Sequence, residues 1–176
     1  VGARSPDACI PCGAGRFNNA VGQSQCVPCA AGTFTEDDEA ESCTQCPLGG
    51  YCPDAGASSR LVFQACPAGT YNSDVGQTSN ASCVACPQGT ANPIPGSTSV
   101  AVCSDCLPGS YSAAPGESTC TLCTSGATFQ VDAGQSACQQ CSSCPANTWM
   151  AGPCYPQQDV NCQNCSNVEC APGQIR

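Results

Sequence analysis

The chain has 176 residues, 21 of them Cys, and carries thirteen acidic residues against four Arg, with no Lys or His. A net charge of −9 excludes a surface built to bind nucleic acids or anionic membranes, because like charges repel. The absence of His removes the usual general base, and no apolar run is long enough to span a bilayer or insert into one. This cysteine fraction is typical of a disulfide scaffold, which places the chain outside the cell or at its surface, reached through the secretory pathway.

A cysteine phrase repeats along the chain. Residues 1–11 have the form of the end of an upstream repeat closed by Cys9. After Cys12 each repeat opens with Cys, two residues and Gly, and most then reach an aromatic residue. The openers and the aromatics that follow them are Cys12 with Phe17, Cys29 with Phe34, Cys46 with Tyr51, Cys66 with Tyr71, Cys106 with Tyr111 and Cys123 with Phe129, while Cys86 is followed by Ala91.

Each phrase returns through a second Gly to the first Cys of the next C-x-x-C. We therefore predict that each opener bonds that closing Cys. The predicted pairs are Cys12–Cys26, Cys29–Cys43, Cys66–Cys83, Cys86–Cys103, Cys106–Cys120 and Cys123–Cys138. Cys46 and Cys52 are left over between complete repeats, and we pair them as a short loop. Each longer loop contributes about 3 kcal/mol in the chain-entropy model, so several together replace a missing core.

The expected architecture is a small disulfide-rich repeat array of irregular loops and short β-hairpins with almost no helix. Pro and Gly after each opener set tight turns. We expect the aromatic residues to pack each repeat on its neighbour, including Trp149. Since such repeats contact only adjacent repeats, we also expect an elongated rod. Phe63, Met150 and Tyr155 lie outside this register and are candidates for contacts with another molecule.

The phrase C-x-x-C-[PAL]-x-G-[TS]-[YF] over residues 12–138 resembles the ephrin-receptor-like cysteine-rich repeats of extracellular proteins. Residues 123–164 look like a cysteine-rich module of the tumour-necrosis-factor receptors. That resemblance implies the pairs Cys123–Cys138, Cys141–Cys154 and Cys144–Cys162. Residues 165–176 resemble the start of a further module. Long arrays of this kind are similar to surface glycoproteins of protists and algae, including flagellar-hair (mastigoneme) proteins.

An odd cysteine count leaves at least one without an internal partner. The nine pairs leave Cys9, Cys165 and Cys170. The last two could bond each other, but we predict that Cys9 bonds upstream and the other two bond downstream.

Other sites were weighed against simpler interpretations. Paired C-x-x-C also occurs in zinc ribbons, but an oxidising compartment and an odd count favour disulfides. The run Glu36, Asp37, Asp38 and Glu39 could hold Ca²⁺, but it lacks the ligand spacing of an EF-hand and is better interpreted as a solvated loop tip. We expect no bound metal or cofactor. Asn80 and Asn164 begin N-glycosylation sequons, and Ser/Thr-rich tips are candidates for O-linked sugar.

No catalytic constellation is present without His, so we expect no enzymatic activity. The leading hypothesis is an extracellular structural glycoprotein segment, a disulfide-stapled stalk or filament-forming rod. Its partners would be other copies or neighbouring modules of the same protein, joined end to end. The alternative is a ligand-binding ectodomain of a cell-surface receptor.

Overall fold

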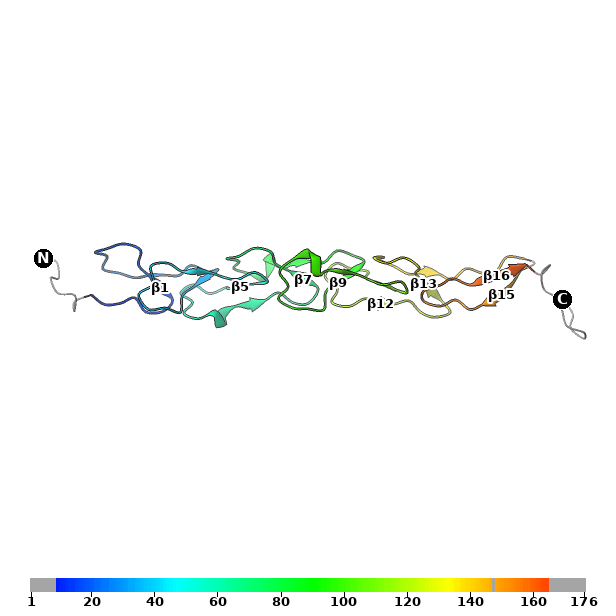
Figure 1. Cartoon of the computed structure of the whole chain (residues 1–176), viewed down its shortest axis with the longest axis horizontal. Coiled ribbons are helices and arrows are strands. Elements are labelled where there is room, and N and C mark those ends of the chain that lie inside the picture. The colour runs from blue at the N-terminus through cyan, green and yellow to red at the C-terminus, as the bar shows by residue number, and fades with distance from the viewer. Residues whose placement is uncertain (1–8, 147, 165–176) are drawn as a thin grey trace, which may run out of the picture. The chain divides into compact units, whose positions relative to one another are not determined.

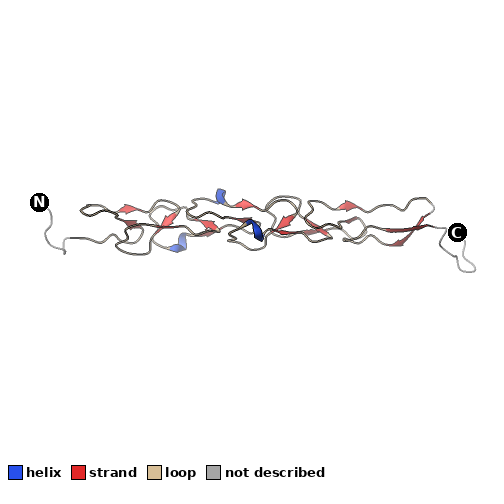
Figure 2. Cartoon of the chain, turned by 45° about the horizontal axis from the view of Figure 1, so that its top comes forward, coloured by secondary structure: helices blue, strands red, loops and turns tan. Residues whose placement is uncertain are grey.

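The computed structural model describes residues 9–146 and 148–164. The chain divides into two compact units. Unit 1 contains Val1–Ala85 and Ile94–Val102, and unit 2 contains Cys86–Pro93 and Cys103–Arg176. Every contact named below between separate segments joins residues of the same unit. Short antiparallel hairpins separated by loops make up nearly all of the regular structure (Figures 1 and 2).

The described part of unit 1 holds four two-stranded hairpins, and each forms where a repeat's aromatic segment meets the two residues before the next opener. The strands are β1 (Arg16–Phe17) with β2 (Val27–Pro28), β3 (Thr33–Phe34) with β4 (Thr44–Gln45), β5 (Gly50–Tyr51) with β6 (Gln64–Ala65), and β7 (Thr70–Tyr71) with β8 (Val84–Ala85). Among the described residues of this unit, three single-turn 3-10 helices lie in the loops: η2 (Arg60–Val62), η3 (Asn80–Ser82) and η4 (Val100–Val102).

Unit 2 continues the same arrangement. Its strands are β9 (Thr90–Ala91) with β10 (Ser104–Asp105), β11 (Ser110–Tyr111) with β12 (Thr121–Leu122), β13 (Thr128–Phe129) with β14 (Gln139–Gln140), and β15 (Thr148–Gly152) with β16 (Asn161–Asn164). The last hairpin is the longest and contains a register shift between Met150 and Gly152. No α-helix occurs in the described residues, and none of their helices is long and apolar enough to cross a membrane.

Nine disulfides staple the described chain. They join Cys12–Cys26, Cys29–Cys43, Cys46–Cys52, Cys66–Cys83, Cys86–Cys103, Cys106–Cys120, Cys123–Cys138, Cys141–Cys154 and Cys144–Cys162. These pairs coincide with those expected from the sequence. The opening cysteines form the interior: those from Cys29 to Cys106 are completely buried, and Cys12 and Cys123 nearly so. Sulfur thus occupies the space that aliphatic side chains fill in larger domains.

Small and polar side chains complete this interior. The residue directly after each aromatic, called here the post-aromatic residue, is buried in six repeats: Thr35, Cys52, Asn72, Asn92, Ser112 and Gln130. The aromatic rings are less uniform. Phe34 and Phe129 are buried, Tyr51, Tyr71 and Tyr111 are half-buried, and Trp149 is 43% exposed. The structure therefore assigns most of the interior packing to the position after the aromatic rather than to the aromatic itself.

Candidate inter-repeat interface

Three backbone hydrogen bonds recur between successive repeats. The first starts at the Gly three residues after each opener, called here the first turn glycine. Its N–H donates to the carbonyl of the next repeat's post-aromatic residue. The observed bonds run from Gly15 to Thr35, Gly32 to Cys52, Gly49 to Asn72, Gly89 to Ser112 and Gly109 to Gln130, at 2.7–3.0 Å. A backbone group fixed by the turn thus contacts the most buried site of its neighbour.

The second bond uses the residue four before each closing Cys, or its structural equivalent, called here the second turn residue. Its N–H donates to the opener carbonyl of the preceding repeat. The donors and acceptors are Glu39 to Cys12, Gly56 to Cys29, Gly76 to Cys46, Gly96 to Cys66, Gly116 to Cys86 and Gly134 to Cys106, at 2.7–2.9 Å. All the glycines in this set have positive φ, and Glu39, at φ 64°, is the one described non-glycine residue in that region.

The third bond returns in the opposite sense. Each post-aromatic N–H donates to the carbonyl that follows the second turn residue of the next repeat. Examples are Asn18 to Ala40 at 3.0 Å, Thr35 to Ala57 at 3.2 Å and Ser112 to Gln135 at 3.1 Å. In unit 2 the ladder extends into the last module, where Gln130 donates to Pro156 at 2.8 Å and Gly126 donates to Cys154 at 3.0 Å. The interface is therefore built from backbone groups. The same bonds join the ephrin-receptor-like repeats to one another and to the last module, which resembles the tumour-necrosis-factor receptors.

The first turn glycines also touch the repeat after next. A Cβ added to Gly15 would overlap the Gly56 carbonyl oxygen, and the same is true of Gly32 with Gly76, Gly49 with Gly96 and Gly89 with Gly134. The expectation that each repeat contacts only adjacent repeats is therefore wrong. Glycine at both turns lets the two backbones approach so closely that a repeat contacts the repeat after next as well as its adjacent repeat.

Asn72 shows how a side chain reinforces this backbone ladder. Its Nδ2 donates to the Gly50 carbonyl of the preceding repeat at 2.8 Å and to the Asp74 carbonyl at 3.1 Å. The Asp74 N–H donates back to Asn72 Oδ1 at 3.0 Å. Since the side chain is 1% exposed, these bonds replace all the water that the amide would otherwise bind.

The acidic run takes part in the same contacts. Glu36 Oε1 accepts from the Arg60 N–H at 2.7 Å and from Ser59 Oγ at 3.5 Å. Asp38 Oδ1 accepts from the Ala14 N–H at 3.0 Å, in the preceding repeat. These two carboxylates therefore accept from different neighbouring repeats, and all four acidic residues of the run are exposed.

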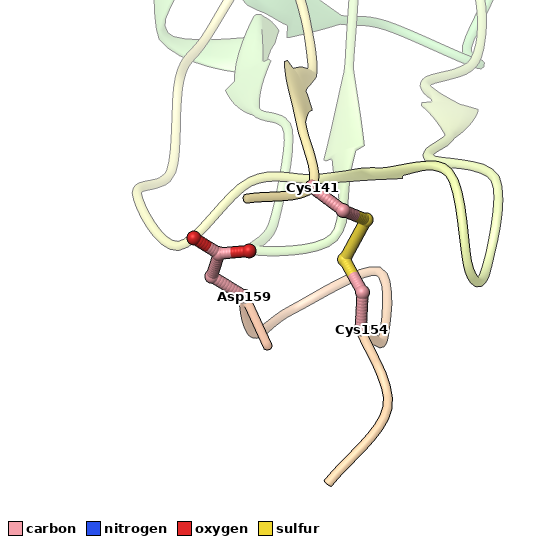
Figure 3. A group of neighbouring side chains, drawn as sticks. All are labelled: Cys141, Cys154 and Asp159. Atoms are coloured by element: carbon pink, nitrogen blue, oxygen red, sulfur yellow. A yellow bond between two sulfur atoms is a disulfide. The ribbon is translucent and has the colours of Figure 1, made fainter. Parts of the chain in front are cut away.

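One group of metal-ligand types occurs among the described residues: Cys141, Cys154 and Asp159. Figure 3 shows the two sulfur atoms bonded to each other, with the Asp159 carboxylate beside them. Sulfur in a disulfide is not a thiolate ligand, so the group is a disulfide with an adjacent carboxylate. Hydrogen bonds from the Ser142 hydroxyl and from the Ser142 N–H, together with one from the Val160 N–H, lower the pKa of Asp159.

The remaining predicted positions lie as follows. Asn80 is exposed at the start of η3, which leaves its amide accessible. Asn164 ends β16, but Cys165, Ser166 and Cys170 lie outside the described residues. Cys9 is exposed and has no disulfide partner in the part of the chain that the structure describes.

Sequence reasoning missed the second turn and post-aromatic positions as contact sites. A signal existed, because Gly recurs four residues before Cys120 and Cys138, and small or polar residues follow the aromatics. The sequence alone indicates only turn chemistry within one repeat. The sequence also gives no sign that the Phe63 ring lies directly over Gly50, and its contact with another molecule stays a prediction.

Comparison with known families matches the chain to two models. The first, described as tyrosine-protein kinase ephrin type A/B receptor-like, matches residues 3–42, 20–61 and 64–103, together more than half of the chain. The second, the TNFR/NGFR cysteine-rich region, matches residues 123–162. No curated protein matches the chain. The chain therefore consists of cysteine-rich, receptor-like extracellular modules, which are typically non-enzymatic.

Proposed function

Because the chain belongs to the ephrin type A/B receptor-like family of cysteine-rich repeats, we propose that it is a structural segment of an extracellular glycoprotein. Its work is mechanical: successive repeats form a stalk or filament, and disulfides resist extension and proteolysis. Sugar at Asn80 and acidic loop tips keep its surface hydrated. The chain reaches its place through the secretory pathway, where the disulfides form.

The observation that carries this proposal is the recurrence of the same three backbone bonds from repeat to repeat. No described residue hydrogen bonds to the Asn18 carbonyl, the Gly22 N–H or the Gln23 carbonyl, which are the groups that receive the preceding repeat at later junctions. A cavity of about 280 Å³ is lined by Cys9, Asn18 and Glu39 among others. This edge has the chemistry to receive another repeat end to end.

The test is electron microscopy of native material together with its intact mass, measured with and without reductant. Filaments or stalks with a regular repeat, and Cys9 in a disulfide to another segment or copy, support the proposal. A matched pair of variants locates the contact. Gly22→Val places a side chain on the free edge and should shorten the assemblies, whereas Val21→Thr, at a fully exposed neighbour, should not. A monodisperse monomer with Cys9 as a free thiol would refute the proposal.

A second candidate function is a ligand-binding receptor ectodomain. Three large side chains in the last module favour it: Trp149 is 43% exposed, Met150 55% and Tyr155 53%. Exposed aromatic and Met side chains are enriched in protein–protein interfaces. Under this alternative, Trp149→Ala abolishes capture of a protein ligand and leaves assembly unchanged. Under the structural proposal, no ligand is captured by either form.

A further inference from the structure

The repeat that opens at Cys46 departs from the others at three positions. Phe63 stands three residues before the next opener, where the other repeats carry their closing Cys. Cys52 stands at the post-aromatic position, where the following repeats carry Asn72 and Asn92. Gly50 stands at the first position of its strand, where the first repeat carries Arg16 and the other repeats carry Thr or Ser. The closing disulfide has therefore moved to Cys46–Cys52.

These three changes fit together in space. A Cβ added to Gly50 would overlap the Gln64 carbonyl oxygen and lie 2.5 Å from Cε2 and Cζ of Phe63, so the paired strand and the ring together occupy the space above a residue without a side chain. Cys52 is completely buried and bonds an opener that is equally buried. The repeat keeps its hairpin, since β5 still pairs with β6, but a packed ring replaces the covalent closure.

The moved disulfide leaves one stretch of chain without covalent protection. Residues 53–65 lie between the loop closed by Cys52 and the loop opened by Cys66. Elsewhere from Cys12 to Cys162, every stretch outside a disulfide loop is only two residues long. A backbone cut in a closed loop leaves both sides joined through sulfur. A cut within residues 53–65 separates them.

This unprotected stretch carries an exposed arginine. Arg60 is exposed in η2, and Leu61, on the other side of the peptide bond, is 92% exposed. The other arginine among the described residues, Arg16, lies in β1 inside the Cys12–Cys26 loop, and its Nη1 donates to the Cys26 carbonyl at 3.2 Å. With no Lys in the chain, basic cleavage sites are scarce, and one of them stands where a single cut divides the array.

We propose that the Arg60–Leu61 peptide bond is the site at which an arginine-specific endoprotease severs this chain. Hydrolysis adds one water across the bond, which leaves a carboxylate on Arg60 and an amino group on Leu61. A few bonds hold the turn closed: the Glu36 carboxylate accepts from the Arg60 N–H, and Ser59 Oγ accepts from the Leu61 N–H at 3.1 Å. Local opening of residues 53–65 presents the bond to the protease. Cleavage at this bond depends only on the disulfide arrangement and the exposed arginine, so it is expected both for a stalk and for a receptor ectodomain.

The experiment is limited trypsin digestion of the native, oxidised full chain, followed by denaturing electrophoresis without reductant and by mass spectrometry. We expect two separated fragments, one of which begins at Leu61. Arg60→Gln should keep residues 5–176 in one piece under the same digestion, whereas Arg16→Gln should be severed like the original. If trypsin cuts after Arg16 while the chain stays in one piece without reductant, the proposal is wrong.

A second variant tests the role of the moved disulfide. Cys52→Asn and Phe63→Cys together give this repeat the residues of the next one at those two positions, while Gly50 is kept because a Cβ there would overlap the Gln64 carbonyl oxygen. Cys46 can then bond position 63 and enclose Arg60. Cleavage should then yield one band without reductant and two with it. Severing of this variant without reductant, after mapping shows the Cys46–position 63 bond, would overturn the argument.

Glu36→Gln removes the charge that holds the turn, and it should speed severing by about tenfold, the effect of losing one charge-assisted hydrogen bond. A rate unchanged from that of the original chain would contradict cleavage through opening of this turn.

Discussion

The close approach of the first turn glycines gives the sharpest prediction. Gly89 and Gly126 have φ of +80° and +79°, so replacement by Ala forces the same unfavourable backbone conformation on both. They differ in their surroundings. A Cβ on Gly89 would overlap the Gly134 carbonyl oxygen and lie 3.3 Å from the Gln135 nitrogen, whereas a Cβ on Gly126 meets nothing within 4 Å among the described residues.

The magnitudes follow from these two environments. A left-handed conformation costs a residue with a Cβ about 1–2 kcal/mol. The smaller freedom of Ala in the unfolded chain offsets about 0.4–1 kcal/mol of that cost. Gly126→Ala should therefore lose about 1 kcal/mol. Gly89→Ala must also push apart two backbones, and overpacking adds about 1–3 kcal/mol.

The assay is guanidinium unfolding with the disulfides intact, combined with amide hydrogen exchange at Gly134, whose N–H donates to the Cys106 carbonyl at 2.9 Å. Gly89→Ala should lower the unfolding midpoint further and accelerate exchange at Gly134, whereas Gly126→Ala should leave that amide protected. Equal losses in the two variants would refute contact between a repeat and the one after next.

Three further predictions concern single side chains. Glu39→Gly should raise the free energy of unfolding by about 0.5–1 kcal/mol, because Glu39 takes a φ of 64° at a turn where glycine serves in later repeats; calorimetry that finds a loss contradicts this. Asn72→Ala should cost about 2–4 kcal/mol in guanidinium unfolding, because it leaves buried backbone groups unpaired, whereas exposed Asn19→Ala should cost nearly nothing. Because the folded-state pKa of Asp159 is lowered, its stabilising effect is complete above the ordinary carboxyl range near about pH 4 and is lost as the pH falls through the lower folded value. Protection of the Ser142 amide should therefore decrease on acidification in the original chain but stay nearly flat in Asp159→Asn, and parallel pH profiles would count against the assignment.

Most of the fold can be predicted from the cysteine spacing, because a disulfide between residues close in sequence leaves few conformations for the chain between them. The hairpins follow from the same closure, since each strand pair sits where the C-x-x-C meets the aromatic segment, as with Phe17 opposite Val27. Cys46–Cys52 follows by elimination once the neighbouring repeats are complete.

The interface between repeats could not be predicted from the sequence, and the reason is physical. The contacts between repeats use backbone N–H and carbonyl groups, which every residue has, so no side-chain pattern marks them. In the sequence, Gly15 and Gly56 indicate only ordinary turns. Nothing in the sequence shows that the turn at Gly15 packs on the turn at Gly56, which belongs to the repeat after next. The packing of Phe63 is hidden for a related reason: it depends on the missing side chain of Gly50, a pairing that appears only in the three-dimensional structure.

The interior of sulfur and small polar groups also has a thermal consequence. Heat-capacity changes on unfolding scale with the apolar surface exposed, at about 12–15 cal/mol/K per residue for ordinary domains. Here the completely buried side chains are Cys, Asn and Ser, and large side chains such as Leu107 and Leu122 are already exposed. Unfolding with the disulfides intact should therefore change the heat capacity less, and the stability curve should be flat. Cold weakens such a chain little, since hydrophobic burial contributes little of its stability at any temperature.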